Sequence, residues 1–409
     1  MSDLTIGLLL GTEEDWPAAF EALVGRLGPV AGETLRTERI LNEPFDLRYK
    51  PRYSVVIDRL AWWYDLPRAW LKKVSLMDDV YLLNNPFTFQ AMEKHSAYCA
   101  LMRLGIRVPE TWLIPHKVPP ANERFQSTAE RYNAPFDLET IGDNVGYPMY
   151  LKPFDGGQWR GVTRARNEEE LRRRYDESGE QLMHVQSAVD DFEVFARSLS
   201  IGAETMVMWF DPSKPMYDRY QVKHDFLSPE LGDEIVSIAR LVNAFFRWEF
   251  NSCESLVRGT EVHPIDYANA SPDVALTSLH YYFPWAMETL VKWCAFCTAT
   301  GRRMDIDQDK RRYFDIGDRE DLTYEEKLRE YRTIVDEYFQ VAEYEEFCAR
   351  SLPDAHEVVV DYFGSPEFDA LLVEEVQRVF PAHEHEEMVA RHRGLVGAWV
   401  KDQSPGAKR

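Results

Sequence analysis

The order of apolar and polar positions predicts alternating strands and helices in the first 85 residues. Short apolar runs between turn residues predict buried strands, and apolar positions at helical spacing predict helices. The predicted strands are 5–10, 53–58 and 80–83, and the predicted helices are 16–27 and 67–75. Strands that alternate with helices in this way are typical of a small parallel α/β unit.

The pattern changes after Pro86, where alternating segments typical of antiparallel strands appear. The predicted strands are an edge strand between Pro109 and Pro115, then 147–152, 182–188, 193–199, 205–210, 249–256 and 262–267. The predicted helices in this part are 88–104, 168–178 and 229–246. Residues 117–140 are polar and contain prolines, so we expect an exposed loop or insertion there.

The last third of the chain is predicted to be largely helical, with helices at 285–300, 324–349, 365–380 and 384–400. The fold class expected is therefore α/β with α+β character, in three parts. These are an N-terminal α/β domain over 1–85, a mixed domain over 86–285 and a mainly helical C-terminal region over 286–409.

Charge and composition exclude several classes of function. The chain has 409 residues and a formal net charge of −22, whereas a general nucleic-acid surface needs a basic footprint. The longest apolar runs, such as Ile6–Leu10, are too short to span a bilayer. The start of the chain lacks the shape of a signal peptide, and five cysteines suggest reduced thiols. These features predict a cytoplasmic protein that binds neither nucleic acid nor a membrane.

The most informative candidate chemistry lies around Lys152. This lysine ends a short apolar strand, and a loop containing Gly156, Gly157 and Gly161 follows at once. A lysine beside backbone N–H donors that have no Cβ in front of them suits a nucleotide polyphosphate. The alternative is that the Gly-Gly pair is a simple hairpin turn.

Several segments, taken in order, resemble the ATP-grasp superfamily. They read NNPFTFQAMEKHSAYCALMRLGIRVPETWLI, YPMYLKPFDGGQWRGV, MHVQSAVDDFEVFARSL, YQVKHDF and FNSCESLVRGTEVHPIDYANASPD. The resemblance covers residues 84–273 and implies two α+β subdomains that clamp a nucleotide. The N-terminal α/β segment then corresponds to the domain that precedes ATP-grasp in this family.

The resemblance implies roles for three lysines. In the family, one lysine near the first helix and another on the next strand contact the α- and β-phosphates, and here these are Lys94 and Lys152. Gly156 and Gly157 belong to the loop over the phosphates. Lys223 corresponds to the later lysine that steadies the γ-phosphate. The alternative for each lysine is a solvated surface position.

The adenine site implied by the resemblance is the run Gln186, Ser187, Ala188 and Val189. The backbone of this run is expected to hydrogen-bond the base edge, with Gln186 at a position where the family often has glutamate. Glu193 is expected to accept the ribose hydroxyl groups, because a carboxylate accepts strong hydrogen bonds. The alternative for Glu193 is an exposed strand position.

Glu254, Asp266 and Asn269 correspond to the metal ligands of the family. Oxygen ligands on adjacent strands suit Mg²⁺ shared with phosphates, with Mn²⁺ as the alternative metal. The family commonly places the last acid two residues before the asparagine, whereas the spacing here is three. We expect a β-bulge at Tyr267–Ala268 to turn Asp266 and Asn269 toward one pocket.

The function implied is an ATP- and Mg²⁺-dependent carboxylate–amine ligase, or a carboxylate–thiol ligase, that forms an acyl phosphate. Its substrates would be small molecules or peptides. Lys223, Arg160 and Arg197 are the catalytic candidates, the two arginines as groups that hold the acyl phosphate or the substrate carboxylate. The partners expected are ATP, a carboxylate and an amine, with a homodimer as the assembly considered. Two alternatives stay open: a kinase of the same fold that phosphorylates a hydroxyl, and a nucleotide-binding protein with little turnover that acts through its helical C-terminal region.

Overall fold

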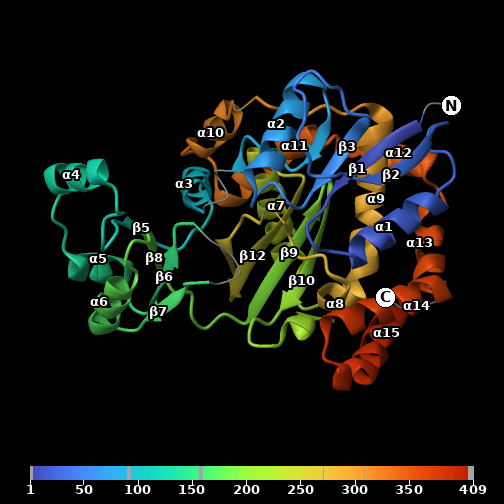
Figure 1. Cartoon of the computed structure of the whole chain (residues 1–409). Helices are drawn as coiled ribbons and strands as arrows, with labels where there is room; N and C mark the ends of the chain where they lie inside the picture. Colours follow the sequence, from blue (N-terminus) through green and yellow to red (C-terminus); the bar gives the residue numbers. More distant parts are fainter. Residues whose placement is uncertain (1–2, 90–93, 156–159, 270, 308, 404–409) are drawn as a thin grey trace.

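The protein contains three β-sheets surrounded by helices (Figure 1). The computed structural model describes residues 3–89, 94–155, 160–269, 271–307 and 309–403. Gly156 and Gly157, the predicted phosphate-loop glycines, lie outside the described residues.

The N-terminal sheet is parallel, as the strand–helix alternation predicts, with strand order β2-β1-β3-β4. Its elements are β1 (Asp3–Leu9), α1 (Asp15–Arg26), β2 (Thr34–Arg39), β3 (Tyr53–Asp58), α2 (Asp65–Met77) and β4 (Tyr81–Leu83). The edge strand β2 was not predicted, because its sequence TLRTER lacks an apolar run. Residues 40–53 lead from β2 across β1 to β3. Gly7 of β1 lies close to the start of this segment, since a Cβ there would lie 2.6 Å from Ile40 Cδ1.

The central lobe is built on an antiparallel four-stranded sheet with order β5-β8-β6-β7. Its elements are β5 (Thr111–Ile114), α4 (Glu123–Tyr132), α5 (Leu138–Val145), β6 (Met149–Pro153), β7 (Thr163–Ala165), α6 (Glu168–Glu177) and β8 (Met183–Ser187). Residues 117–140, predicted to be an exposed loop or insertion, are mostly exposed, but they form α4 and the start of α5 in place of a loop. The side chains of Asn122 and Asp137 cap these two helices, which is a signal that the polar composition concealed.

The five-stranded sheet has the order β11-β10-β9-β12-β13. Its strands are β9 (Val194–Ile201), β10 (Glu204–Phe210), β11 (Tyr220–Gln221), β12 (Phe250–Arg258) and β13 (Glu261–Asp266). Helix α3 (His95–Arg103) is shorter than the predicted helix and begins after Lys94. Helix α7 (Pro229–Phe246) has the predicted bounds, with Ser228 capping it and Pro229 in its first turn.

The C-terminal region is helical, as predicted. It contains α8 (Leu276–Leu279), α9 (Phe283–Thr300), α10 (Arg311–Gly317), α11 (Tyr324–Phe339), α12 (Val341–Ser351), α13 (Ala355–Phe363), α14 (Pro366–Val379) and α15 (His385–Asp402). The predicted helix 324–349 is broken at Gln340, whose φ is +50°. None of the described helices is both long enough and apolar enough to cross a membrane.

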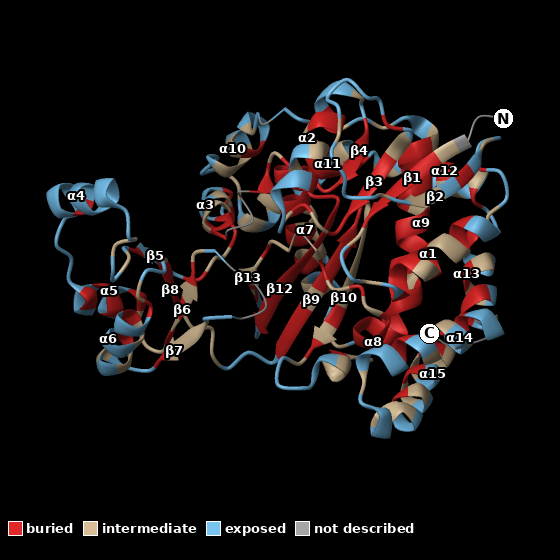
Figure 2. Ribbon diagram, in the orientation of Figure 1, coloured by how far each residue is buried: buried red, intermediate tan, exposed pale blue. Residues whose placement is uncertain are grey.

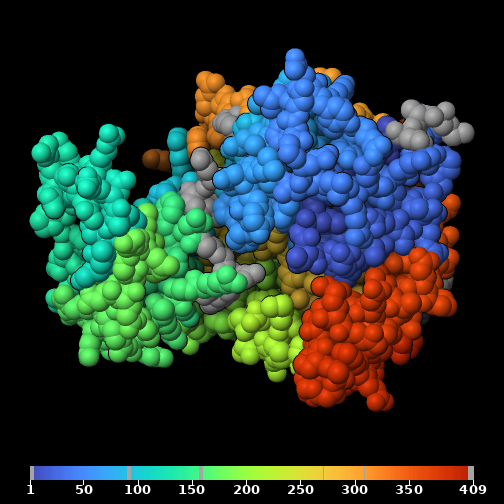
Figure 3. Space-filling model, viewed as in Figure 1, coloured from blue at the N-terminus to red at the C-terminus, as the bar shows by residue number. Residues whose placement is uncertain are grey.

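Helix α9 is buried nearly all round and contacts both the N-terminal and the five-stranded sheet (Figure 2). One large hydrophobic core consequently unites these two sheets with the C-terminal helices. The central lobe has a separate, smaller core around Leu151, Leu171 and Val185. Figure 3 shows this lobe, coloured teal to green, projecting at one side of the molecule. The fold therefore consists of one large body and one small lobe.

Candidate active site

Three charged side chains form a row across the five-stranded sheet. Glu254 of β12 lies opposite Arg197 of β9 and also opposite Asp266 of β13 in the strand register. Residues directly opposite on neighbouring strands project from the same face. Arg197 Nη1 lies 3.6 Å from Glu254 Oε1, and only 15% and 10% of these two side chains are exposed. The row thus holds a guanidinium and a carboxylate that are largely removed from water, and a second carboxylate, Asp266, whose side chain is 33% exposed.

The row faces away from helix α7. Asn251 precedes Ser252 on β12, and its Nδ2 donates to Asn243 Oδ1 of α7 at 2.8 Å. Successive residues of a strand point to opposite faces, so Ser252 and Glu254 share the face that α7 leaves uncovered.

Two lysines from outside the sheet reach this uncovered face. Lys94 precedes α3 with a φ of +78°, and its Nζ lies 2.6 Å from Asp266 Oδ2. Lys152 of β6 donates to Gln186 Oε1 at 2.6 Å and to the carbonyl oxygen of Ile265 at 3.3 Å. Lys152 therefore joins the central lobe to β13, beside the carboxylate that Lys94 contacts.

Burial and mutual charge shift the pKa values of this group. Burial lowers the pKa of Lys152 to about 8, with nearby Asp266 acting in the opposite direction. Burial raises the pKa of Glu254, which Arg197 counteracts and Asp266 reinforces. Burial also opposes ionisation of Asp266, but the charge and hydrogen bond of Lys94 hold its pKa below the ordinary value. A further cation between the two carboxylates would relieve their repulsion.

The irregularity in β13 does not lie where we expected it. The register shifts between Glu254, opposite Asp266, and Ser255, opposite Pro264, so the extra residue is Ile265. The bulge predicted at Tyr267–Ala268 is wrong, because the strand has already ended at Asp266. Tyr267 is fully buried and packs on Tyr98, with ring centroids 5.5 Å apart. It belongs to the core and does not enter the cleft.

Asn269 nevertheless reaches the face that carries the row. Its backbone N–H donates to Asn251 Oδ1 at 2.7 Å, and its Nδ2 donates to Ser252 Oγ at 3.4 Å. Ser252 also accepts from Arg197 Nη2 at 3.3 Å. Glu254, Asp266 and Asn269 thus all belong to one face, brought there by the end of the strand.

The oxygen donors of this set fit a magnesium ion. Asp266 Oδ1 is buried and has no hydrogen-bond partner among the described residues. Carboxylate and amide oxygens are the donors that Mg²⁺ prefers, and Mg²⁺ is usually bound by one or two carboxylates together with phosphates. Within the described ranges, no cluster of three His, Cys, Asp or Glu side chains could hold a metal alone. The two carboxylates would therefore need the oxygens of a bound nucleotide to complete the coordination.

Comparison with solved structures decides the fold. The D-alanyl-alanine synthetase A of Vibrio cholerae superposes with a TM-score of 0.51 at 13% identity, over 73% of this chain and 99% of its own. The chain has the ATP-grasp fold. No protein-family model and no curated protein matches the sequence.

Two further solved structures superpose with lower TM-scores. The ATP-grasp RimK domain protein of Sphaerobacter thermophilus has a TM-score of 0.49 at 12% identity, over 72% of this chain and 99% of its own. The D-alanine–D-alanine ligase of Bacillus anthracis, solved with ATP, has a TM-score of 0.47 at 12% identity, over 84% of this chain and 99% of its own.

Three other predicted site residues of the ATP-grasp domain lie apart from the row. Lys223 Nζ lies 3.4 Å from the ring centroid of Trp209, which leaves the sheet on the face opposite Arg197. Glu193 is exposed, and its Oε2 accepts from the backbone N–H of Gly259 at 3.0 Å. Arg160 is exposed on the turn before β7. The structure therefore does not bring these three side chains to the lysine pair.

The predicted adenine hinge is partly engaged within the protein. Gln186 is buried, and besides accepting from Lys152 it donates from Nε2 to Thr111 Oγ1 at 2.8 Å. The backbone N–H of Ser187 donates to Glu110 O, and that of Ala188 donates to Pro148 O. Val189 is half-buried. Contacts of this run to a base would consequently use its carbonyl groups or the amide of Val189.

Sequence reasoning overlooked a ring cluster beneath the lysines. His184 lies opposite Lys152 in the register and two residues before Gln186, so all three share a face. Its Nε2 lies 3.2 Å from His95 Nδ1, and its ring stacks on Phe154 at 5.6 Å. Burial, followed by the charge of His95, lowers the pKa of His184 to about 4. The available signal was the two-residue spacing of His184 and Gln186 on one predicted strand.

Proposed function

We propose that the protein is an ATP-dependent carboxylate–amine ligase that acts through an acyl phosphate. The observation that carries the proposal is the convergence of Lys94 and Lys152 on the Arg197–Glu254–Asp266 row. Two ammonium groups beside two carboxylates and a guanidinium match the needs of phosphoryl transfer, which depends on positioning and charge neutralisation. The D-alanyl-alanine synthetase that shares the fold supports this choice.

In the first step, a substrate carboxylate oxygen attacks the γ-phosphorus of ATP. A new P–O bond forms, the bond between the γ-phosphorus and its bridging oxygen breaks, and ADP leaves. Lys152 and Lys94 would neutralise phosphate oxygens, and Lys94 would exchange Asp266 for phosphate in doing so. Glu254, Asp266 and Asn269 would hold Mg²⁺, which supplies charge neutralisation at the phosphates when bound.

In the second step, the amine attacks the acyl carbon. The C–N bond forms, the C–O bond to phosphate breaks, inorganic phosphate leaves with the electron pair, and the amine loses a proton. Arg197 is the buried guanidinium of the row and would hold the acyl oxygen as charge develops on it. A thiol acceptor would follow the same course.

The test combines ATP and Mg²⁺ with pools of carboxylates and amines and measures ADP, inorganic phosphate and phosphorylated product. A ligase releases ADP and phosphate together and needs both substrates for full turnover. Hydroxylamine in place of the amine should trap the acyl phosphate as a hydroxamate. Transfer of phosphate to a hydroxyl acceptor would indicate a kinase, and nucleotide binding without ADP formation would indicate a nucleotide-binding protein with little turnover.

A further inference from the structure

A pocket of about 940 Å³ lies between helix α2, residues 86–89 and the end of β6. This pocket is distinct from the row, since none of Arg197, Glu254 and Asp266 lines the pocket. Its size falls in the range of small-molecule sites. The elements around it come from both the N-terminal sheet and the central lobe, which is where ligand sites between domains commonly occur.

The walls of this pocket are mainly aromatic. The rings of Trp62 and Trp63 lie edge to face at 6.3 Å, and Trp62 meets Phe89 at 6.1 Å. Phe87 and Phe154 also line the pocket. Trp63 is 59% exposed, and an exposed indole at the mouth of an aromatic pocket offers a large surface for a flat apolar group.

The pocket adjoins the phosphate lysines. Phe154 follows Lys152 by two residues, and its N–H donates to Leu182 O, which continues the pairing of β6 with β8. Lys152 and Phe154 therefore project from the same face, about 7 Å apart along the chain. A ligand in the pocket would extend its reactive end along this face toward the nucleotide.

The charged groups at the rim suit a zwitterion. Arg68 is already paired with Asp65. Lys72 lies over the ring of Phe87 at 5.8 Å and has no ion pair among the described residues. Asp155, which follows the end of β6 and also lines the pocket, likewise has none within that part of the chain. One free ammonium and one free carboxylate thus flank the aromatic walls.

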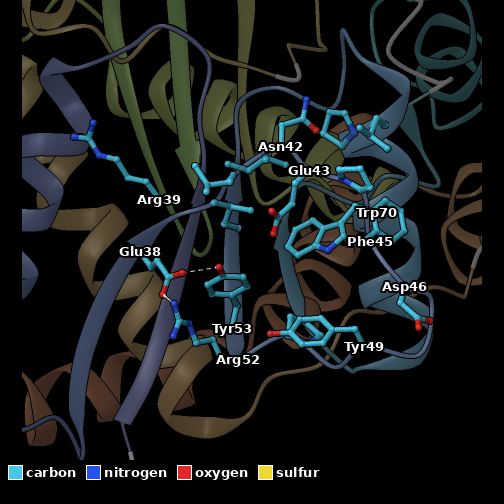
Figure 4. Close-up of a pocket in the computed structure, with 17 residues that line it drawn as sticks. Glu38, Arg39, Asn42, Glu43, Phe45, Asp46, Tyr49, Arg52, Tyr53 and Trp70 are labelled. Carbon is cyan, nitrogen blue, oxygen red and sulfur yellow. Dashed lines mark hydrogen bonds and ion pairs between the residues drawn. The ribbon is translucent and has the colours of Figure 1, made fainter.

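A second pocket, of about 660 Å³, lies on the other side of α2 and has fewer unpaired charged groups (Figure 4). Its Glu38 is bound by Tyr53 and Arg52, as the dashed lines in Figure 4 show. Its Arg39 is held by Glu14 and Glu21. Most of its charge is therefore satisfied inside the protein, and it lies away from the lysine pair.

We infer that the pocket between α2 and β6 binds one substrate of the ligation, and that this substrate is an aromatic amino acid or a short peptide carrying one. The aromatic group lies between Trp63 and Phe87, the carboxylate meets Lys72 and the ammonium group meets Asp155. This inference rests on the proposed function, because it assigns the substrate class of that reaction.

The experiment measures binding of DL-phenylalanine to the full chain by titration calorimetry. Three probes each lack one of its groups. Alanine lacks the ring, 3-phenylpropionate lacks the ammonium group and phenethylamine lacks the carboxylate. Phenylalanine should bind at least tenfold more tightly than each of the three. Trp63→Ala and Lys72→Met should each weaken its binding about tenfold, whereas Trp63→Phe should retain most of it.

Tyr64→Ala provides the matched control, since Tyr64 is 58% exposed beside Trp63 but does not line the pocket. Equal affinities for phenylalanine and alanine, no binding of phenylalanine, or an equal loss in Tyr64→Ala would overturn the inference. ATP binding is measured on the same samples. Retained ATP binding with no preference for the ring refutes only the pocket assignment, whereas a wild-type chain that does not bind ATP refutes the proposed function.

Discussion

Lys94 and Asp266 are 172 residues apart in the chain, yet Lys94 Nζ lies 2.6 Å from Asp266 Oδ2. Only 11% of the lysine side chain is exposed. The contact links the segment before α3 to the end of β13, and it occupies one oxygen of a carboxylate whose other oxygen has no partner among the described residues. Under the proposed function, a metal ion would take the place of Lys94 at this carboxylate when the nucleotide binds.

The Asp266 carboxylate should account for the metal dependence of ATP binding. Asp266→Asn should abolish the gain in ATP affinity that Mg²⁺ produces, because it removes one of the two carboxylates proposed to bind the ion. Calorimetric titrations of ATP with Mg²⁺ and with EDTA check this. Glu261→Gln, an exposed position on the same strand, should keep the full effect. An unchanged response to Mg²⁺ in Asp266→Asn would remove this residue from the metal set.

Lys152 should make ATP binding depend on pH. Lys152→Met should weaken binding by about 1.5–3 kcal/mol, the range for a hydrogen bond to a charged group. Because the pKa of Lys152 is about 8, the wild-type affinity should fall above pH 8, by up to about tenfold per pH unit. The variant should lack this fall, and Lys117→Met, on the surface of the same lobe, should retain it. Parallel pH profiles for wild type and Lys152→Met would contradict the assignment.

His184 should destabilise the fold in mild acid. Its pKa in the folded protein, about 4, lies below the ordinary value of 6.5, so the unfolded chain takes up a proton first as the pH falls. The stabilising contribution is complete above pH 6.5 and is lost as the pH falls toward 4. The loss between pH 7 and pH 5 amounts to about 2 kcal/mol of the free energy of unfolding.

Urea titrations at the two pH values test this loss. His184→Gln should show a smaller loss than wild type by that amount, and His383→Gln, at an exposed position, should behave as wild type. An identical pH dependence in His184→Gln would show that other groups cause the acid sensitivity.

Gly202 should be intolerant of any side chain. It lies between β9 and β10 with a φ of +54°, and a Cβ there would come 1.9 Å from Trp293 Cδ2 of α9. Gly259 has a similar φ of +60° with open space around it. Gly259→Ala should cost about 1 kcal/mol from the backbone alone, and Gly202→Ala about 1–3 kcal/mol more from the clash. Equal unfolding free energies for the two variants would mean that the Trp293 contact relaxes without cost.

Particular elements show where the sequence was informative. Helix α7 was predictable to the residue, because its apolar face, the Ser228 cap and Pro229 all agree. Strand β2 was not, since an edge strand of polar residues has no local signature. The helices at 123–145 were concealed by polarity, although Asn122 and Asp137 were available as capping signals.

Some features of the site were likewise predictable from the sequence, and others were not. The ATP-grasp resemblance named Lys94, Lys152 and Asp266, and the structure places them together. The extra residue at Ile265 depends on the pairing of β12 with β13, which no single strand reveals. The contacts of Lys223 and Glu193 likewise depend on side-chain orientation, and this is decided by partners distant in the sequence.

The separate core of the central lobe has a mechanical consequence. Because its apolar side chains do not merge with the large core, the lobe can open or unfold without exposing the interior of the body. Amide protons of β6 and β8 should accordingly exchange through a partial opening of lower free energy than global unfolding. A nucleotide held between Lys152 on the lobe and Asp266 on the body would close that opening. ATP would thus protect the lobe selectively, and the protection would end when the products leave.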